Sequence, residues 1–354
     1  MKEITIEEFF SLKDPIVIDI RSPIEFKDGA VPGAINVPLF TDKERQEVGT
    51  IYKQEGPAAA KWRAMELVSP KLPAMLETIK AYHECGELVI YCWRGGMRSK
   101  AVVTFLEFAG IYAWRLFGGY KSYRQYILER IPEMFPKNAV VLHGMTGVGK
   151  TVILKMLKQQ GYPVLDLEEM AGHRGSIFGT IGLGEGHNQK TFDSLLFKGL
   201  EDIQGADYFL VEAESKRIGK AVQPEELMEL KLNGVHFYIH SPLEQRVKQL
   251  VSEYVLPYEK ETWYHEKITI GIESILRRMK NLDVKKQLAE LLHERKYSEL
   301  IPILLENYYD TRYNHAKQEY VGKFIDIYAE NPAEAAAKIV GKLNELSLLP
   351  TIAC

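Results

Sequence analysis

One cysteine of the chain lies in a setting that favours nucleophilic chemistry. Cys92 ends the apolar run LVIYC and is followed by WRGGMRS, a short stretch that contains two glycines and two arginines. The backbone N–H groups of such a loop can converge on an anion, and the N-terminus of a following helix adds positive charge. These groups favour the thiolate form over the thiol. We therefore predict that Cys92 attacks a bound oxyanion or a sulfur-like atom.

The neighbours of Cys92 decide between this interpretation and an inert cysteine buried at the end of a strand. Gly95 and Gly96 let the backbone curl tightly, and the two arginines add charge, which favours the reactive interpretation. Cys85, in the polar turn HECGE, and Cys354, the last residue, are predicted to be inert. The predicted catalytic residues are Cys92, Arg94, Gly95, Gly96, Arg98 and Ser99.

A second motif points to phosphate binding. GMTGVGKT, at residues 144–151, fits G-x-x-x-x-G-K-[ST] and lies between a predicted strand and a predicted helix. Backbone N–H groups would cradle a diphosphate, Lys150 would add a positive charge, and the Thr151 hydroxyl can hold Mg²⁺ or a phosphate oxygen. A glycine turn that only caps a helix would not explain Lys150 and Thr151. The predicted phosphate-binding residues are Gly144, Thr146, Gly147, Val148, Gly149, Lys150 and Thr151.

Nearby carboxylates bear on which diphosphate this loop binds. ATP and GTP enzymes usually place an aspartate at the end of a neighbouring strand, where it organises Mg²⁺. Here YFLVEAES offers Glu212 and Glu214, and VLDLE offers Asp166 and Glu168, so the match is loose. The sequence contains no guanine-reading N-K-x-D. Arg246 fits two interpretations equally, a lid residue that reaches phosphates and a solvated helix charge.

The elements that must position these residues alternate between strand and helix. PIVIDIR, LVIYC and YAWRLFGG are predicted strands, and SKAVVTFLEFAG is a predicted helix from Ser99 to Gly110. Such alternation indicates a parallel α/β sheet. Pro132 and Pro136 are predicted to break any helix in ERIPEMFPKNAV, which places a domain boundary near residue 136.

The second part of the chain repeats this alternation around the phosphate loop. AVVLHG, YPVLDLE, ADYFLVEAES and VHFYIHS are predicted strands, each followed by helix-compatible sequence. After about residue 243 the chain is predicted to be mainly helical. The length of 354 residues fits two domains. We predict an α/β domain at 1–134, a parallel α/β phosphate-loop domain at 135–245, and a helical part at 246–354 that completes it.

Composition narrows the class of protein. A net charge of −3 excludes a broad basic face but leaves room for a local basic groove that could hold RNA. The sequence has no apolar run near 18 residues and no signal-peptide core, so we expect no membrane span and a cytoplasmic protein. Three cysteines are too few and too scattered for a disulfide framework, and no His/Cys cluster has metal-ligand spacing, so no metal centre is predicted.

Residues upstream of Cys92 carry a family resemblance. VIDIRSPIEFKDGAVPGAINVP, together with the cysteine loop, resembles the rhodanese homology domain over roughly residues 5 to 130. The resemblance implies a rhodanese-like fold and a cysteine, here Cys92, that carries a persulfide or, in relatives, attacks phosphate. The residues that match the pattern are Asp19, Arg21, Glu25, Phe26, Gly29, Pro32, Gly33, Ala34, Ile35, Asn36 and Pro38.

The loop departs from common sulfurtransferases in its length. Five residues separate Cys92 from Arg98, one more than usual, and C-x5-R also fits protein tyrosine phosphatases. A wider loop suits a tetrahedral phosphate or a selenophosphate. Phosphatases usually have a histidine before the cysteine and an aspartic general acid, whereas here Tyr91 precedes the cysteine and no loop aspartate is evident. A phosphatase is therefore the second choice for this domain.

The whole chain resembles the tRNA 2-selenouridine synthase family. The segments that carry the match are VGTIYKQEG, CWRGGMRS, FGGYKSYR, GMTGVGKT, DLEEMAGHRGSIFG and ESKRIG. The resemblance implies a tRNA-modifying transferase that converts wobble 2-thiouridine to 2-selenouridine through S-geranyl-2-thiouridine. It also implies geranyl diphosphate and selenophosphate as co-substrates, the first at the phosphate loop and the second at Cys92, with no firmly bound cofactor. The RNA partner would be the anticodon region of tRNA.

Other residues are candidates for substrate or tRNA contacts. AGHRGSIFG could cover the diphosphate or grip an RNA phosphate, and ESKRIG could contact phosphate, although both also fit polar surface turns. The basic helical stretch that includes Arg277 and Arg278, and the aromatic segment NYYDTRYNHAK at 307–317, are predicted as a tRNA-binding region taken together. The individual candidates are Asp166, His173, Arg174, Glu212, Lys216 and Arg217.

Two other classes of function remain open from the sequence. The chain could be a small-molecule P-loop kinase whose rhodanese part transfers sulfur or acts as a phosphatase, and ATP turnover without RNA would favour this. It could also be a rhodanese-like module that only binds. A reactive Cys92 argues against the binding module, and slow alkylation of Cys92 near neutral pH would favour it.

Overall fold

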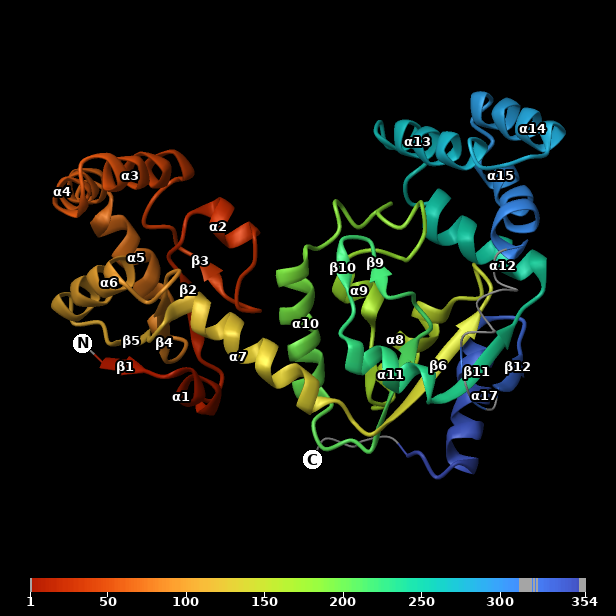
Figure 1. Ribbon diagram of the computed structural model, residues 1–354, viewed down its shortest axis with the longest axis horizontal. Helices are drawn as coiled ribbons and strands as arrows, with labels where there is room; N and C mark the ends of the chain where they lie inside the picture. Colours follow the sequence, from red (N-terminus) through yellow and green to blue (C-terminus); the bar gives the residue numbers. More distant parts are fainter. Residues whose placement is uncertain (1, 312–319, 321, 323, 350–354) are drawn as a thin grey trace. The chain divides into compact units, whose positions relative to one another are not determined.

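The computed structural model describes residues 2–311, 320, 322 and 324–349 (Figure 1). The chain folds as two compact units. The first contains residues 1–131 together with 193–197, and the second contains residues 132–192 together with 198–354. In the described part of the chain, no helix is both long and apolar enough to cross a membrane. The predicted α/β fold with parallel sheets is confirmed in both units.

The first unit is built on a parallel sheet with the order β1-β5-β4-β2-β3. The central strand β4 is buried at every position, as expected of a parallel strand covered on both faces. The strands are β1 (Lys2–Ile4), β2 (Ile16–Asp19), β3 (Ile35–Asn36), β4 (Leu88–Tyr91) and β5 (Ala113–Leu116). The helices are α1 (Ile6–Ser11), α2 (Pro23–Lys27), α3 (Asp42–Gln54), α4 (Pro57–Val68), α5 (Leu72–His83), α6 (Met97–Phe108) and α7 (Gly119–Met134).

Local sequence signals explain where several of these helices begin. Thr5 and Thr41 each form a capping box with a glutamate three residues later, so α1 and α3 begin directly after them. At the start of α2, the N–H of Ser22 donates to Oε2 of Glu25 at 3.2 Å. This places the Glu25 side chain at the N-terminus of a helix, where a carboxylate is stabilised by the helix dipole.

The prediction that Pro132 would break a helix is wrong. Helix α7 runs through Pro132 and ends at Met134. A proline removes one backbone hydrogen bond, but Ile127 and Ile131 of the same helix are buried and keep this part of α7 packed. The helix ends just before Phe135. This residue precedes Pro136, and the residue before a proline disfavours helical dihedral angles.

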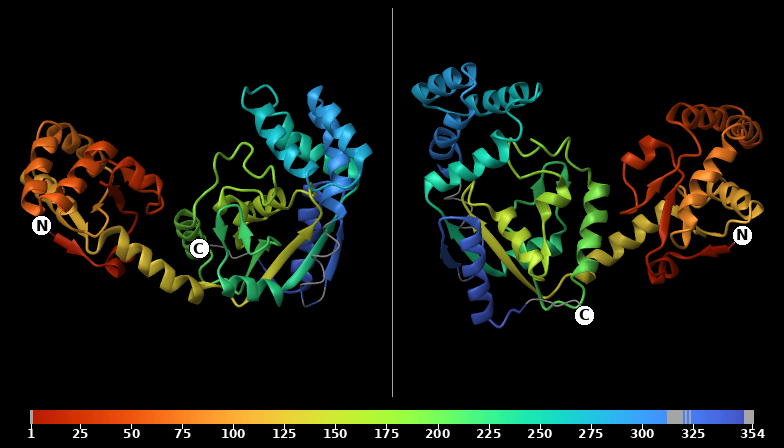
Figure 2. Two further views of the ribbon diagram at one scale, coloured as in Figure 1. Left: turned by 45° about the horizontal axis from the view of Figure 1, so that its top comes forward. Right: turned by 180° about the vertical axis from the view of Figure 1, so that it is seen from behind.

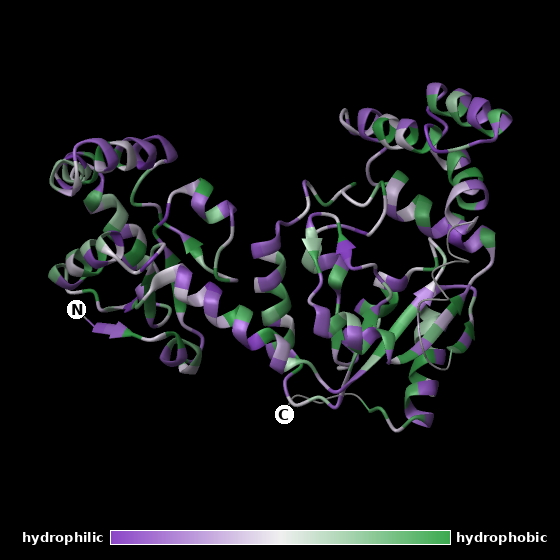
Figure 3. Cartoon of the chain, in the orientation of Figure 1, coloured by the Kyte–Doolittle hydropathy of each residue, from purple (hydrophilic) through white to green (hydrophobic). Residues whose placement is uncertain are grey.

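The second unit has a parallel sheet with the order β12-β11-β6-β8-β7. Its central strand β6 is apolar along most of its length (Figure 3). The strands of the unit, including the antiparallel pair β9 and β10, are β6 (Asn138–Gly144), β7 (Val164–Leu165), β8 (Tyr208–Glu212), β9 (Arg217–Ile218), β10 (Ala221–Val222), β11 (Val235–His240) and β12 (Phe324–Tyr328).

Helices make up the rest of the second unit, and one of them also contains residues 193–197, which belong to the first unit. They are α8 (Lys150–Gln159), α9 (Leu167–Ala171), α10 (Gln189–Asp202), α11 (Glu225–Leu232), α12 (Leu243–Leu250), α13 (Tyr264–Leu276), α14 (Leu282–His293), α15 (Tyr297–Leu304) and α17 (Pro332–Glu345). Two π-helical turns also occur within the described ranges, η1 (Val251–Val255) and η2 (Leu305–Tyr309). The C-terminal part is mainly helical as predicted, but it also supplies β12, which the sequence did not indicate.

Helices α13, α14 and α15 form a group of their own on the side toward which β6 and β11 point (Figures 1 and 2). They have their own apolar core, which includes Ile268, Ile272, Leu288 and Leu300. The sheet has a separate core, in which α8 and α17 pack on β6 and its neighbours. The second unit therefore offers a junction between a sheet edge and an apolar helical group.

The cysteine loop of the first unit is held by a close approach of two backbone segments. The N–H of Tyr120 donates to the carbonyl oxygen of Cys92 at 2.9 Å, and the N–H of Lys121 donates to the carbonyl oxygen of Trp93 at 2.9 Å. A Cβ atom at Gly119 would lie 2.2 Å from the Cys92 carbonyl oxygen and 2.4 Å from the nitrogen of Gly95. This contact therefore requires glycine at position 119.

We expect Gly119→Ala to destabilise the first unit by about 3 kcal/mol, because it adds backbone overlap and a left-handed conformation at φ +60°. Urea unfolding of the full chain, followed by the tryptophans of the first unit, measures the change. Gly96→Ala is the matched control, since an added Cβ at Gly96 meets nothing within 4 Å. Equal stability of the two variants would contradict this account of the loop.

Candidate active sites

Cys92 lies directly after β4, at the N-terminal end of α6. The residue is 2% exposed, and its Sγ lies 3.3 Å from the Oγ of Ser99. Ser99 also donates a hydrogen bond to the carbonyl oxygen of Gly96, the residue that caps α6. The sulfur is thus beside the first turn of a helix, where backbone N–H groups create positive potential. The structure therefore brings Cys92, Gly96 and Ser99 together, as predicted from the sequence.

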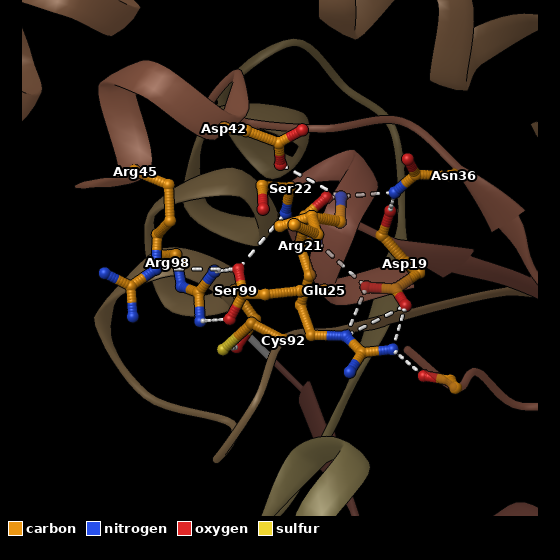
Figure 4. A network of polar contacts seen from close by, with 12 residues as sticks. Asp19, Arg21, Ser22, Glu25, Asn36, Asp42, Arg45, Cys92, Arg98 and Ser99 are labelled. Atoms are coloured by element: carbon orange, nitrogen blue, oxygen red, sulfur yellow. Dashed lines mark hydrogen bonds and ion pairs between the residues drawn. The ribbon is translucent and has the colours of Figure 1, made fainter. Parts of the chain in front are cut away.

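Arg98 is oriented by an acidic partner that the sequence motif did not identify in this role. Its guanidinium donates to both carboxylate oxygens of Glu25, at 2.6 and 3.1 Å (Figure 4). Arg45 approaches the same carboxylate at 3.5 Å. Burial alone would raise the pKa of Glu25, but Arg98 and the backbone N–H of Ser22 hold it below its usual value. Glu25 therefore stays ionised and fixes Arg98, whereas Arg94 is exposed.

Other residues of the rhodanese pattern form a buried support under this site. Arg21 is fully buried and makes a double hydrogen bond to Asp19, with Nε to Oδ1 at 3.0 Å and Nη2 to Oδ2 at 2.6 Å. Its guanidinium lies 4.1 Å from the ring centre of Tyr120. Asn36 donates to the carbonyl oxygens of Asp19 and Arg21. These contacts hold the end of β2 against β3 and the start of α7, which indicates a structural role.

The phosphate loop connects β6 to α8 in the way that the motif requires. Gly144 ends β6, and Gly149 caps α8 with a left-handed conformation at φ +81°. The Nζ of Lys150 donates to the carbonyl oxygen of Gly144 at 3.1 Å. Val148 is buried under the loop. The loop and the start of α8 present five residues to a cavity, Thr146, Gly147, Gly149, Lys150 and Thr151.

Two buried carboxyl groups extend inward from Thr151. The Thr151 hydroxyl donates to Oε2 of Glu168 at 2.5 Å, and the N–H of Glu168 donates to Oε1 of Glu212 at 2.7 Å. Burial, with repulsion from Glu214, raises the pKa of Glu168 to about 7. Burial also raises the pKa of Glu212 well above its usual value. Near neutral pH these groups therefore carry less negative charge than their number suggests.

This region has limited capacity for a metal ion. Across the described residues, no group of three or more His, Cys, Asp or Glu side chains could hold one. Mg²⁺, however, is often held by one or two protein oxygens together with substrate phosphates. Thr151 and Glu168 provide such a pair of oxygens. These two residues could therefore hold a Mg²⁺ ion, which would supply positive charge to a bound diphosphate.

A cavity of about 360 Å³ leads from the phosphate loop into the helical group. Its polar lining includes Lys150, Glu168, Arg174 and Glu214 beside the loop, and Arg278 of the helical group. The rest is apolar or aromatic. These lining residues are Ile177, Phe178, Ile181, Leu250, Tyr254, Val255, Tyr264, Ile268, Ile272, Tyr297, Leu300, Ile301, Leu304, Leu305, Tyr308 and Tyr309. The cavity thus combines an anion-binding loop with a mainly apolar chamber.

The predicted segment AGHRGSIFG forms part of the cavity wall. Arg174 donates to the carbonyl oxygen of Ile181 at 2.9 Å, and its guanidinium lies 4.8 Å from the ring centre of Tyr254. Phe178 packs so closely on α13 that a Cβ at Gly271 would lie 2.2 Å from its ring. The segment is therefore docked against the helical group and is more than a polar surface turn.

The remaining predicted contacts lie apart from the cavity lining. Asp166 caps α9 through the N–H of Glu169, and Glu212 is fully buried behind Glu168. The His173 N–H donates to the Glu168 carbonyl oxygen, and burial lowers the pKa of its ring. Lys216 forms an exposed ion pair with Glu225, and Arg217 is exposed on β9. Of the six candidates, all described in the structure, Arg174 alone lines the cavity, and a tRNA role for the others stays a prediction.

The structure places two C-terminal residues whose individual roles the sequence left open. Arg246 is not a solvated charge, because it is 2% exposed and forms a double hydrogen bond with Asp310, with Nη1 to Oδ1 at 3.0 Å and Nη2 to Oδ2 at 2.9 Å. Tyr308 is buried and lines the cavity, so it is not a surface group that could stack on an RNA base. Arg312 and Tyr313 lie outside the described residues. Sequence reasoning missed Tyr254, because nothing in its local sequence indicates a cavity.

The raised pKa of Glu168 gives a pH dependence of stability with a defined sign. The folded state holds a proton on Glu168 up to about pH 7, whereas the unfolded chain releases it near 4.5, so stability falls as pH rises between these values. We expect Glu168→Gln to remove this contribution to the loss of stability with rising pH and to raise Tm at pH 8 by roughly 5 °C.

Calorimetry from pH 5 to 8 in the presence of EDTA measures this effect. Glu169→Gln is the matched control, because Glu169 is the exposed neighbour of Glu168. A Glu168→Gln curve parallel to that of the unaltered protein over the whole pH range would contradict the raised pKa.

Comparison with known proteins agrees with this arrangement. The family model described as the tRNA 2-selenouridine synthase AAA domain matches residues 137–342, and the rhodanese-like domain model matches residues 6–126. A tRNA 2-selenouridine synthase of Pseudomonas syringae pv. syringae is 36% identical over 307 residues, which cover 83% of this chain and 81% of that protein. One of Pseudomonas savastanoi pv. phaseolicola is 33% identical over 350 residues, which cover 89% of this chain and 94% of the relative. The chain therefore belongs to the tRNA 2-selenouridine synthase family.

Proposed function

We propose that this protein replaces the sulfur of 2-thiouridine in tRNA with selenium in two steps, a geranylation of the sulfur and a displacement by selenophosphate. The membership of the chain in its family supports a tRNA substrate and a 2-selenouridine product. The observation that carries the two-step route is the cavity that joins the phosphate loop to an apolar chamber. A prenyl diphosphate combines the same two properties in one molecule.

The chamber favours a prenyl chain over a nucleoside. A base and a ribose carry several polar groups, and each one buried without a partner would cost about 1–3 kcal/mol. The chamber beyond the loop is lined mainly by Ile, Leu and Tyr side chains. Each CH₂ group of a prenyl chain buried there would contribute about 0.8 kcal/mol. The same cavity therefore favours geranyl diphosphate over ATP.

In the first step, a bond forms between the sulfur of 2-thiouridine and C1 of the geranyl group, the C1–O bond breaks, and diphosphate leaves. Lys150 and the backbone N–H groups of the phosphate loop would stabilise the charge that develops on diphosphate. Arg174 lies in the same cavity and can add to this stabilisation. A Mg²⁺ ion held by Thr151 and Glu168 would neutralise further charge on the leaving group. The residues that line the chamber would keep water from the reacting carbon.

In the second step, the selenium of selenophosphate forms a bond to C2 as the C2–S bond breaks and the geranylthiol leaves. Water then cleaves the Se–P bond, so that phosphate is released and 2-selenouridine remains. The Cys92 loop would hold selenophosphate, because it combines a helix N-terminus with the fixed guanidinium of Arg98. Cys92 would serve selenium delivery from the floor of this loop. The two steps use separate groups of residues, so each can be tested alone.

One feature supports the alternative of a small-molecule kinase. The Thr151–Glu168 pair is the kind of oxygen pair that organises Mg²⁺ on ATP. ATP turnover in the absence of RNA would favour this function. The apolar lining of the chamber makes it the second candidate.

The direct test uses the purified full-length protein and tRNA that contains 2-thiouridine. We expect geranyl diphosphate and selenophosphate together to give 2-selenouridine, and geranyl diphosphate alone to give S-geranyl-2-thiouridine. Mass spectrometry of the digested nucleosides identifies each product. Unchanged 2-thiouridine in both reactions would overturn the proposal and direct attention to ATP-dependent activity.

Two variants should separate the two steps. We expect Lys150→Ala to slow geranylation by about 100-fold, because it removes charge from the leaving-group site, and to leave selenation of pre-geranylated tRNA within about threefold. Cys92→Ala should show the reverse pattern. Cys85→Ala is the matched control, since Cys85 is an exposed cysteine of the same unit. Exchange of the two phenotypes would refute the assignment of steps to sites.

A further inference from the structure

The two π-helical turns found in the described part of the chain line the same cavity. Residues of η1 and η2 both contribute to its wall, with Tyr254 from η1 and with Tyr308 and Tyr309 from η2. Well under 1% of residues in globular proteins are π-helical, and such turns occur frequently at functional sites. This coincidence marks the tyrosines of the cavity wall as candidates for a role in the reaction.

Tyr254 lies at the boundary between the phosphate loop and the apolar chamber. A Cβ at Gly147 would lie 3.1 Å from the side chain of Leu250, so α12 ends against the loop. Tyr254 follows Leu250 by four residues and lies about one helical turn further along the same face. Its ring also contacts the guanidinium of Arg174.

The same boundary must hold C1 of a bound prenyl diphosphate. C1 is bonded to an oxygen of the diphosphate, so it lies next to the phosphate loop when the anion is in place. The chain beyond C1 continues into the apolar chamber. Tyr254 lines the same cavity as the loop residues, so its ring can lie beside the carbon at which the bond breaks.

The chemistry of the phenol ring suits a cation at this position. The face of an aromatic ring carries negative potential and attracts cations, as the contact with Arg174 on one face already demonstrates. Burial raises the pKa of Tyr254, so its hydroxyl stays protonated and is a poor nucleophile. Such a ring can lie against a carbocation without being alkylated by it.

We propose that Tyr254 is a catalytic residue whose ring stabilises an allylic cation at C1, and that the substrates of this site are allylic diphosphates that react by ionisation. This inference rests on the proposed geranylation. The C1–O bond breaks first, and its electron pair leaves with diphosphate. A sulfur lone pair of 2-thiouridine then forms the S–C1 bond, and the N3 proton passes to solvent. No atom is oxidised or reduced.

The first test compares Tyr254→Phe with Tyr254→Leu in steady-state geranylation of tRNA. Phe keeps the ring and should retain kcat within about threefold, whereas Leu removes the ring and should lower kcat by about 30-fold. KM for geranyl diphosphate should change by less than about threefold in both variants. Tyr258→Leu is the matched control, because Tyr258 lies four residues further on and does not line the cavity. Equal kcat values for the Phe and Leu variants would overturn the role of the ring.

The second test uses the unaltered protein and 2-fluorogeranyl diphosphate, so it does not depend on the folding of any variant. Fluorine at C2 withdraws electrons and destabilises an allylic cation, but it scarcely changes the size of the molecule. We expect the transfer rate to fall by about 100-fold while binding is retained. A fall of less than about threefold would indicate direct displacement and overturn the cation.

Failure of this inference is distinguishable from failure of the proposed function. Absence of any S-geranyl product from geranyl diphosphate would remove both. Normal geranylation with a small effect of fluorine, or with equal activity of the Phe and Leu variants, would remove the cation alone and leave the proposed function intact.

Discussion

Both reactive loops depend on glycines that neighbouring residues approach too closely to admit a Cβ atom. In the first unit, Gly119 lies against the carbonyl oxygen of Cys92 and the nitrogen of Gly95. In the second, a Cβ at Gly147 would lie 2.9 Å from the carbonyl oxygen of Arg246, and one at Gly149 would lie 2.7 Å from the ring of Pro332. An anion-binding loop acts through N–H groups that must already point at the ligand, so such contacts fix it before the substrate arrives.

The contacts that fix the phosphate loop come from distant parts of the chain. Arg246 belongs to α12 and is held by Asp310, and Pro332 begins α17 after the last strand of the sheet. The C-terminal third is therefore part of the phosphate site as well as of the fold. It also supplies the helices that line the apolar chamber. The C-terminal third therefore adds a surface suited to an apolar substrate to a general anion site.

The features that could be predicted from the sequence are those set by local pattern. The glycine motifs, the strand–helix alternation and the position of Cys92 before a helix all follow from neighbouring residues. The pairing of Glu25 with Arg98, 73 residues apart, does not, because it depends on tertiary packing. Nor does the cavity role of Tyr254, since a π-helical turn has no sequence signature. Tyr308 belongs to the aromatic segment that was predicted as part of a tRNA-binding region, yet packing buries it, and residue type alone does not reveal which side of a helix faces a core.

The acidic groups behind the phosphate loop would repel an anionic diphosphate if all of them were ionised. Partial protonation of these groups reduces the repulsion. Burial raises the pKa of Asp166 to about 6 and that of Glu168 to about 7, so part of this charge is neutralised at neutral pH. Lys231 is also fully buried here and donates to the carbonyl oxygen of Glu214 at 2.6 Å. Burial lowers the pKa of Lys231 to about 8, which still leaves it largely charged at pH 7. A protonated Glu168 and a charged Lys231 together reduce the repulsion of an anionic diphosphate. Binding of an anion can then raise the pKa of Glu168, whereas binding of Mg²⁺ can lower it.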